Sequence, residues 1–167
     1  MKAYKLTDEN GQTKGPTQWG EGVTHTAPGT GNLCSSGWIH TYSHPLLAVL
    51  LNPIHAEFQT PRLWECEVSG ATRDDKGLKQ GWASVTTVRE IPLPKISVEQ
   101  RARFAILCAK AVHRRPTFLL WADRWLSGED RSSATAWAWA AAWAAEEAAD
   151  PIDLIALAEE AVEAQAG

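Results

Sequence analysis

The sequence predicts an α+β protein, in which a small, mainly antiparallel sheet with one helix precedes a bundle of three to four helices. Up to Pro94, short apolar runs that alternate with polar residues are separated by glycine and proline, a pattern typical of strands. After Pro94 the apolar residues recur at helical spacing and alanine becomes abundant. The change of period predicts two domains, a β-rich one over residues 1–94 and an alanine- and tryptophan-rich helical one over 95–167.

The predicted strands of the first half follow one another in the order KAYKLT (2–7), VTHTA (23–27), WIHTY (38–42), RLWECEV (62–68) and SVTTVREIPLP (84–94). The Asn10-Gly11 pair favours a tight turn after the first strand, and we expect an irregular surface loop over residues 12–22. Pro92 and Pro94 cannot donate to a strand ladder, so they mark the end of the last strand or an edge of the sheet.

The clearest strand is RLWECEV, because its apolar and acidic residues alternate. Trp64, Cys66 and Val68 fall on one face, whereas Glu65 and Glu67 fall on the other. The sheet should therefore have one buried and one wet face.

One helix is expected within the β-rich half, at SHPLLAVLLNP. Ser43 or His44 can cap it, Pro45 suits its first turn, and Asn52 followed by Pro53 should close it. On this interpretation His44 is a neighbour of the cap or the cap itself, rather than a metal ligand.

The helical half contains four predicted helices. The first begins with a capping box of Ser97 and Gln100, carries an apolar stripe, and should stop before Pro116. That stripe comprises Phe104, Leu107, Cys108 and Ala111. The second helix places Phe118, Trp121 and Trp125 on one face and ends at Gly128.

The last two predicted helices complete the bundle. The third runs from near Asp130 to about Ala149 and contains three tryptophans. The fourth has Asp150 as its cap and Pro151 at its first position. Its buried stripe comprises Leu154, Leu157, Ala158 and Ala161.

Charge and composition argue against several classes of function and location. The net charge of −4 provides no overall basic field, so sequence-independent binding of nucleic acid is not expected. The N-terminus lacks the apolar core of a signal peptide, and the apolar segment 134–145 is too short to span a bilayer. Cys34, Cys66 and Cys108 form no Cys-x-x-Cys unit, which favours a reducing, cytoplasmic location.

Acidic residues dominate the end of the chain, where residues 134–167 contain no lysine or arginine. These carboxylates form either a solvated face or a surface that docks a basic partner. The predicted partner-binding residues are Glu146, Glu147, Asp150, Asp153, Glu159, Glu160 and Glu163.

No metal site is predicted. Cys34, His40 and His44 are close in sequence, but no pair has the spacing of a structural zinc site. A fourth ligand would have to come from His25, His55 or Cys66. We expect a buried thiol and histidines that form local hydrogen bonds.

The order of segments is similar to that of the ADP-ribosyltransferase fold: Gly37 leads into WIHTY, a helix begins at HPLLAVLL, and late strands end in TTVREIPLP. The resemblance implies that Glu90 is the catalytic carboxylate and that His40 and Tyr42 line its pocket. It also implies that Trp38 and His40 bind NAD. The first strand offers Tyr4 and Lys5 where that family places a histidine or an arginine.

A second resemblance covers residues 1–94. LCSSGWIHTYSHPLLAVL, followed by RLWECEVSG and TTVREIPLP, resembles an uncharacterised domain family found mostly in bacteriophage and prophage proteins. The positions that match are Cys34, Gly37, His40, Pro45, Glu67 and Gly70, with one residue inserted between Gly37 and His40. The alanine-rich C-terminal half is similar to immunity-type proteins of bacteria.

These observations predict an intracellular, non-enzymatic module of phage type that binds a host or phage protein and needs no cofactor. The expected role is counter-defence against a host system. The first alternative is an NAD-dependent enzyme of ADP-ribosyltransferase type that uses Glu90. The second is a structural component of the virion, which would self-associate.

Overall fold

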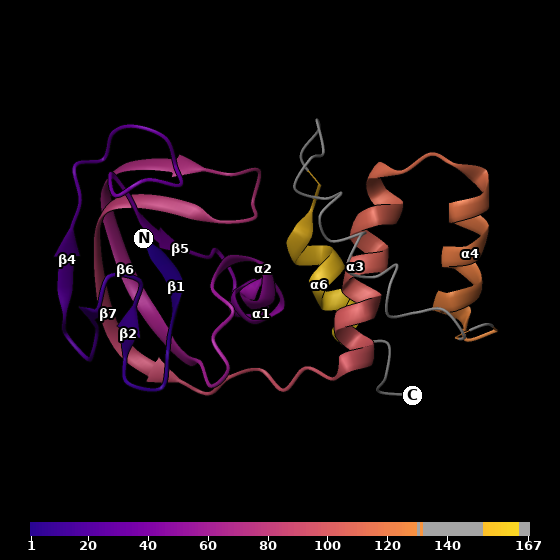
Figure 1. Ribbon diagram of the computed structural model, residues 1–167, viewed down its shortest axis with the longest axis horizontal. Coiled ribbons are helices and arrows are strands. Elements are labelled where there is room, and N and C mark those ends of the chain that lie inside the picture. The colour runs from indigo at the N-terminus through magenta and orange to yellow at the C-terminus, as the bar shows by residue number, and fades with distance from the viewer. Residues whose placement is uncertain (130, 132–151, 164–167) are drawn as a thin grey trace. The chain divides into compact units, whose positions relative to one another are not determined.

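The computed structural model describes residues 1–129, 131 and 152–163 and shows an α+β fold. The chain forms two compact units, Met1–Lys95 and Ile96–Gly167. The first contains the sheet and two short helices, and the second contains the longer helices (Figure 1).

The main sheet of the first unit is antiparallel, with the strand order β1-β6-β7-β4, and β5 also pairs with β7. β6 and β7 form a long hairpin, and their curved ribbons are the largest part of the sheet in Figure 1. The strands are β1 (Lys2–Thr7), β4 (Thr24–Thr26), β5 (Ile39–Thr41), β6 (Arg62–Asp74) and β7 (Gln80–Ile91).

The sheet closes on itself through two tyrosines. Tyr4 in β1 and Tyr42, directly after β5, exchange backbone hydrogen bonds of 2.9 and 2.8 Å. Because β5 pairs with β7, this bridge completes a ring of β1, β6, β7 and β5. The ring brings the first strand of the chain beside the WIHTY segment.

The interior of the ring is apolar. Trp64, Cys66 and Val68 are buried together, as the alternation in RLWECEV predicts, and Glu67 on the other face is exposed. Ile39 packs against the cluster from β5. The buried cluster comprises Ala3, Trp19, Trp64, Cys66, Val68, Trp82 and Val85.

Residues 12–22 are not a wholly irregular surface loop. They contain the small antiparallel pair β2 (Gln12–Thr13) and β3 (Thr17–Gln18), followed by Trp19, which is only 3% exposed. The Trp19 ring belongs to the buried cluster, and its Nε1 donates to Thr13 Oγ1 at 3.0 Å. The burial of this indole anchors the loop to the sheet.

The single helix predicted after WIHTY is two short helices, α1 (Pro45–Leu50) and α2 (Asn52–His55). His44 caps α1, since its Nδ1 accepts a hydrogen bond from the Leu46 amide. Asn52 and Pro53 begin α2 instead of ending the helix. The Asn52 side chain bonds the backbone N–H and oxygen of Phe58, which folds the chain back after α2.

The second unit contains α3 (Val98–Val112), α4 (Pro116–Ser127) and α6 (Leu154–Glu163). The capping box of Ser97 and Gln100 is present at the start of α3. α3 ends at Val112, and Pro116 serves as the first residue of α4. Gly128 ends α4 in the left-handed conformation that glycine adopts without strain.

The core of this unit includes Ile106, Ala122 and Trp125. In α6, Leu154, Ala158 and Ala161 are buried as predicted, and Leu157 is half-buried. Asp153 accepts a hydrogen bond from the Ala156 amide at the start of α6. The predicted third helix, the Asp150 cap and Pro151 lie outside the described residues. No described helix is both long and apolar enough to cross a membrane.

Candidate functional site

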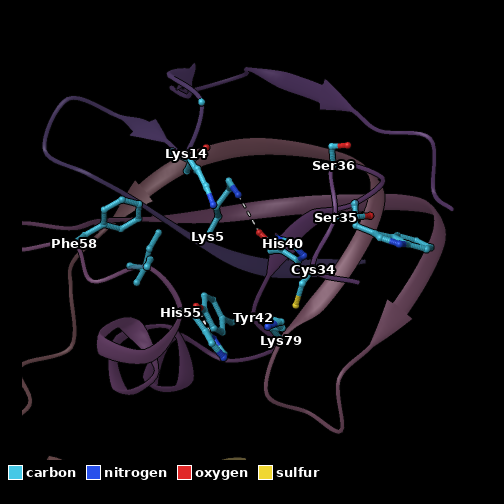
Figure 2. A pocket seen from close by; sticks show the side chains of 15 residues that line it. Lys5, Lys14, Cys34, Ser35, Ser36, His40, Tyr42, His55, Phe58 and Lys79 are labelled. Carbon is cyan, nitrogen blue, oxygen red and sulfur yellow. Dashed lines mark hydrogen bonds between the residues drawn. The ribbon is translucent and has the colours of Figure 1, made fainter. Parts of the chain in front are cut away.

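A cavity of about 840 Å³ opens in the N-terminal unit, where five segments of the chain meet. Lys5 and Leu6 of β1 form one wall, and the β2–β3 turn contributes Lys14 (Figure 2). The loop before β5 adds Cys34, Ser35, Ser36 and Trp38. The remaining wall consists of His40, Tyr42, His55, Phe58 and Lys79.

Lys5 is the most unusual residue of the lining, because it is a lysine with only 7% of its surface exposed. It pairs with Trp64 in the β1–β6 register, so its side chain shares the apolar face of the sheet. Its Nζ donates to the backbone oxygen of His40 at 3.0 Å and lies 4.6 Å from the centre of the Trp19 ring. Burial lowers the pKa of Lys5 to about 8.

The cavity is positively charged. Three lysines line it, Lys5, Lys14 and Lys79, and no aspartate or glutamate is among the lining residues. Asp75 forms an ion pair of 3.6 Å with Lys79, whereas Lys5 has no carboxylate partner within the part of the chain that the structure describes. The lysines give the cavity a field that attracts anions.

Tyr42 and His55 form a stacked pair in the wall. Their ring centres are 5.8 Å apart, and the Tyr42 hydroxyl lies 3.2 Å from His55 Nδ1. Burial, reinforced by the charge of Lys79, lowers the pKa of His55 to about 4. Burial also raises the pKa of Tyr42. Both side chains are therefore neutral at pH 7.

His40 is held by its own loop. Its Nε2 lies 2.5 Å from the backbone oxygen of Leu33, and because a carbonyl only accepts, Nε2 carries the hydrogen. Burial lowers the pKa of His40, and the charges of Lys5 and Lys79 act in the same direction. The neutral ring therefore has its lone pair on Nδ1.

The loop before β5 is fixed by short contacts. The indole Nε1 of Trp38 donates to Gly31 at 3.1 Å, and the Ser35 hydroxyl donates to the backbone oxygen of Asn32 at 2.6 Å. Gly37 packs so closely against the chain that a Cβ there would lie 1.9 Å from the backbone oxygen of Thr30. Cys34 is exposed on this loop with a free thiol.

The structure brings three of the predicted site residues together and leaves one apart. Trp38, His40 and Tyr42 all line the cavity. Glu90 does not, and it forms an exposed, bidentate ion pair with Arg62 at 2.5 and 3.1 Å. His40 pairs with Gly81 in β7, and Glu90 lies nine residues further along that strand, about 30 Å at the usual rise.

The predicted partner-binding carboxylates divide into two groups. Asp153, Glu159, Glu160 and Glu163 are exposed in or beside α6. Glu146, Glu147 and Asp150 lie outside the described residues. The four exposed carboxylates form no salt bridge with other described residues.

The candidate zinc ligands Cys34, His40 and His55 line the same cavity without forming a metal site. Across residues 1–129, 131 and 152–163, no group of three His, Cys, Asp or Glu side chains is arranged to hold a metal ion. His44 caps α1, and the Nε2 of His25 lies 2.8 Å from the backbone oxygen of Gln18. Cys66 and Cys108 are buried, and burial raises the pKa of each thiol.

Sequence reasoning assigned no binding role to Lys5, Lys14 and Lys79, the cationic residues of the cavity, and it considered His55 only as a possible metal ligand. A signal for Lys5 is present in KAYKLT, because Lys5 alternates in phase with the buried Ala3. A lysine on an apolar strand face is unusual enough to mark a site. Lys14 and Lys79 carry no such signal, since each lies next to a turn.

A protein-family model, described as a domain of unknown function (DUF7666), matches residues 1–99. The match covers the whole sheet unit and therefore all the residues that line the cavity. No curated protein and no solved structure matches the chain.

Proposed function

The chain belongs to the DUF7666 family, and we propose that its sheet unit binds a small anionic molecule in the cavity beside Lys5. The observation that supports this proposal is the lining itself, which contains three lysines and no carboxylate. The polar lining residues add hydrogen-bonding groups around the charge. Binding, rather than a chemical reaction, is the function that this arrangement supports best.

The energetics of Lys5 favour an anion. Removing an ammonium group from water costs on the order of several kcal/mol, and a nearby negative charge offsets that cost. The carbonyl of His40 and the Trp19 ring stabilise the ammonium in part. An anion that enters the cavity would complete the set of partners and raise the pKa of Lys5 again.

The size of the cavity favours a metabolite rather than a single ion. A volume of about 840 Å³ lies within the usual range of small-molecule sites. Trp38, Tyr42 and Phe58 contribute aromatic surface to the lining, which suits an organic group next to the anion. NAD, the cofactor implied by the resemblance to ADP-ribosyltransferases, is one anionic molecule of this kind.

Titration calorimetry with pyrophosphate tests the proposal. We expect saturable binding that weakens as the salt concentration rises. Lys5→Met should weaken binding about tenfold or more, because it removes a charge-assisted hydrogen bond. Lys95→Met is the matched control, since Lys95 is exposed at the end of the unit and does not line the cavity. Equal affinities for the wild type and Lys5→Met would overturn the proposal.

A second candidate function is protein binding through the acidic surface of α6. The four exposed carboxylates of residues 153–163 support it, because they would attract a basic partner. Phage origin, a host target and a counter-defence role are finer proposals that follow from the sequence resemblance. Replacing Glu159, Glu160 and Glu163 by glutamine should abolish capture of a host protein, whereas unchanged capture would exclude this surface.

Two other proposals from the sequence have direct tests. An enzyme that uses Glu90 should lose its NAD-dependent activity in Glu90→Ala, whereas anion binding in the cavity should be unaffected.

A virion component should self-associate, which sedimentation of the purified protein would detect as a concentration-dependent increase in mass.

A further inference from the structure

Lys5 offers an amine in a setting that differs from that of a surface lysine. Its side chain is buried on the apolar face of the sheet, and the residue is part of the cavity lining. One hydrogen bond, to the backbone oxygen of His40, fixes the nitrogen, and the Trp19 ring lies on one side of it. A single acceptor occupies only one N–H, so the nitrogen can still face the cavity.

Burial, rather than a neighbouring charge, favours the uncharged amine of Lys5. No carboxylate among the described residues pairs with it, and the other two lysines of the lining are Lys14 and Lys79, of which Lys79 forms an ion pair with Asp75. Burial lowers the pKa of Lys5 to about 8. At pH 8, about half of the molecules would then carry a free amine at Lys5, about 100-fold more than for a lysine of ordinary pKa.

We propose that Lys5 is a covalent binding site, whose Nζ forms an imine with a small aldehyde or ketone that also carries an anionic group. Lys14 and Lys79 would hold the anionic group, and the aromatic wall would exclude water from the imine. The choice of an anionic carbonyl compound rests on the anion binding proposed above. The covalent bond adds a chemistry that anion binding does not require.

The reaction balances without an oxidant or a reductant. The lone pair of the neutral Nζ attacks the carbonyl carbon, a C–N bond forms, and the carbonyl π electrons move to oxygen. A proton passes from nitrogen to that oxygen to give a carbinolamine. Loss of water then forms the C=N bond, and hydrolysis reverses every step. The buried setting of Lys5 supplies the neutral amine that the first step needs.

The test uses glyoxylate, which combines an aldehyde with a carboxylate, on the 167-residue chain at pH 8. Cyanoborohydride reduces any imine to a stable carboxymethyl group, which peptide mass spectrometry assigns to a lysine. We expect Lys5 to be labelled at least about tenfold faster than the exposed Lys95, which has ordinary access to the reagent. Lys5→Arg keeps a positive charge but should lose the fast label.

The outcomes separate the two proposals. Labelling of Lys5 no faster than of Lys95, in a protein that binds pyrophosphate, would overturn the imine site and leave the anion site intact. Fast labelling of Lys5 that excess pyrophosphate suppresses would support both. A protein that neither binds pyrophosphate nor reacts preferentially at Lys5 would overturn both. Circular dichroism of Lys5→Arg confirms that the loss of label does not reflect loss of the fold.

Discussion

The Nζ atom of Lys5 lies 3.0 Å from the backbone oxygen of His40. This hydrogen bond crosses from β1 to β5, next to the bridge between Tyr4 and Tyr42 that closes the sheet. The cationic group of the cavity thus lies at the point where the ring of strands is completed. The charge of Lys5 should therefore influence both ligand binding and the stability of the sheet unit.

The stability of the protein should rise between pH 8 and pH 10 because of Lys5. Its pKa is about 8 in the folded chain against 10.5 for an ordinary lysine, so the unfolded chain binds more protons in this interval. The free energy of unfolding then increases with pH. Urea unfolding at pH 7.5, 9 and 10 should show this rise in the wild type and not in Lys5→Met. Identical profiles would contradict it.

His55 should make the protein less stable in mild acid. Its pKa is about 4 in the folded chain against 6.5 ordinarily, so the unfolded chain binds more protons as the pH falls below 6.5. His40, whose pKa is also lowered, acts in the same direction. We expect His55→Gln to reduce the loss of stability between pH 7 and pH 5 by on the order of 1 kcal/mol. Urea midpoints at the two pH values measure it.

Gly37→Ala should destabilise the loop that carries Cys34 and Trp38. The new Cβ would lie 1.9 Å from the backbone oxygen of Thr30, and backbone cannot rotate away as a side chain can. We expect a cost of about 2 kcal/mol or more and weaker pyrophosphate binding. Gly20→Ala is the control, because its Cβ would meet only the Val23 side chain at 3.7 Å. Thermal unfolding of both variants makes the comparison.

Glu90→Gln should change stability by less than about 1 kcal/mol, because its ion pair with Arg62 is largely exposed to solvent. Pyrophosphate affinity should be the same as in the wild type, since Glu90 does not line the cavity. Calorimetry and urea unfolding of the variant test both statements. A large loss of affinity would mean that Glu90 acts on the site from a distance.

Ser97→Ala should cost about 1 kcal/mol in the helical unit and leave the cavity unaffected. It removes the hydrogen bond of 3.1 Å from the Gln100 amide to the Ser97 hydroxyl at the start of α3. Hydrogen exchange of the α3 amides should report the change. A matching loss of pyrophosphate binding would show that the two units are energetically coupled.

The sequence predicted correctly those features that depend on the spacing of neighbouring residues. The alternation in RLWECEV placed Trp64 and Cys66 on the buried face, and the spacing of Ser97 and Gln100 predicted the capping box. The predictions were wrong where the local structure depends on contacts with residues far away in the sequence. Residues 12–22 look like a loop, and Trp19 is buried because strands elsewhere in the chain provide the surface that covers it.

The candidate site shows the same division. The resemblance to the ADP-ribosyltransferase fold implied His40, Tyr42 and Trp38, which are close together in sequence, and these three residues line one cavity. Glu90 was assigned to the same site because of the order of segments. It lies near one end of β7, whereas His40 pairs with Gly81 near the other end. Segment order carries no information about how far along a strand two residues lie, so sequence could not exclude Glu90 from the cavity.

The sequence by itself determined the α+β class, the alternation in RLWECEV and the capping box of α3, because the residues of each signal are close together in the chain. The tertiary structure decided the role of Lys5. Only the antiparallel pairing of β1 with β6 and the closure through Tyr4 and Tyr42 bring this lysine onto the apolar face and against His40. Charge, burial and access to a cavity are properties of that assembled environment, and no single segment contains them.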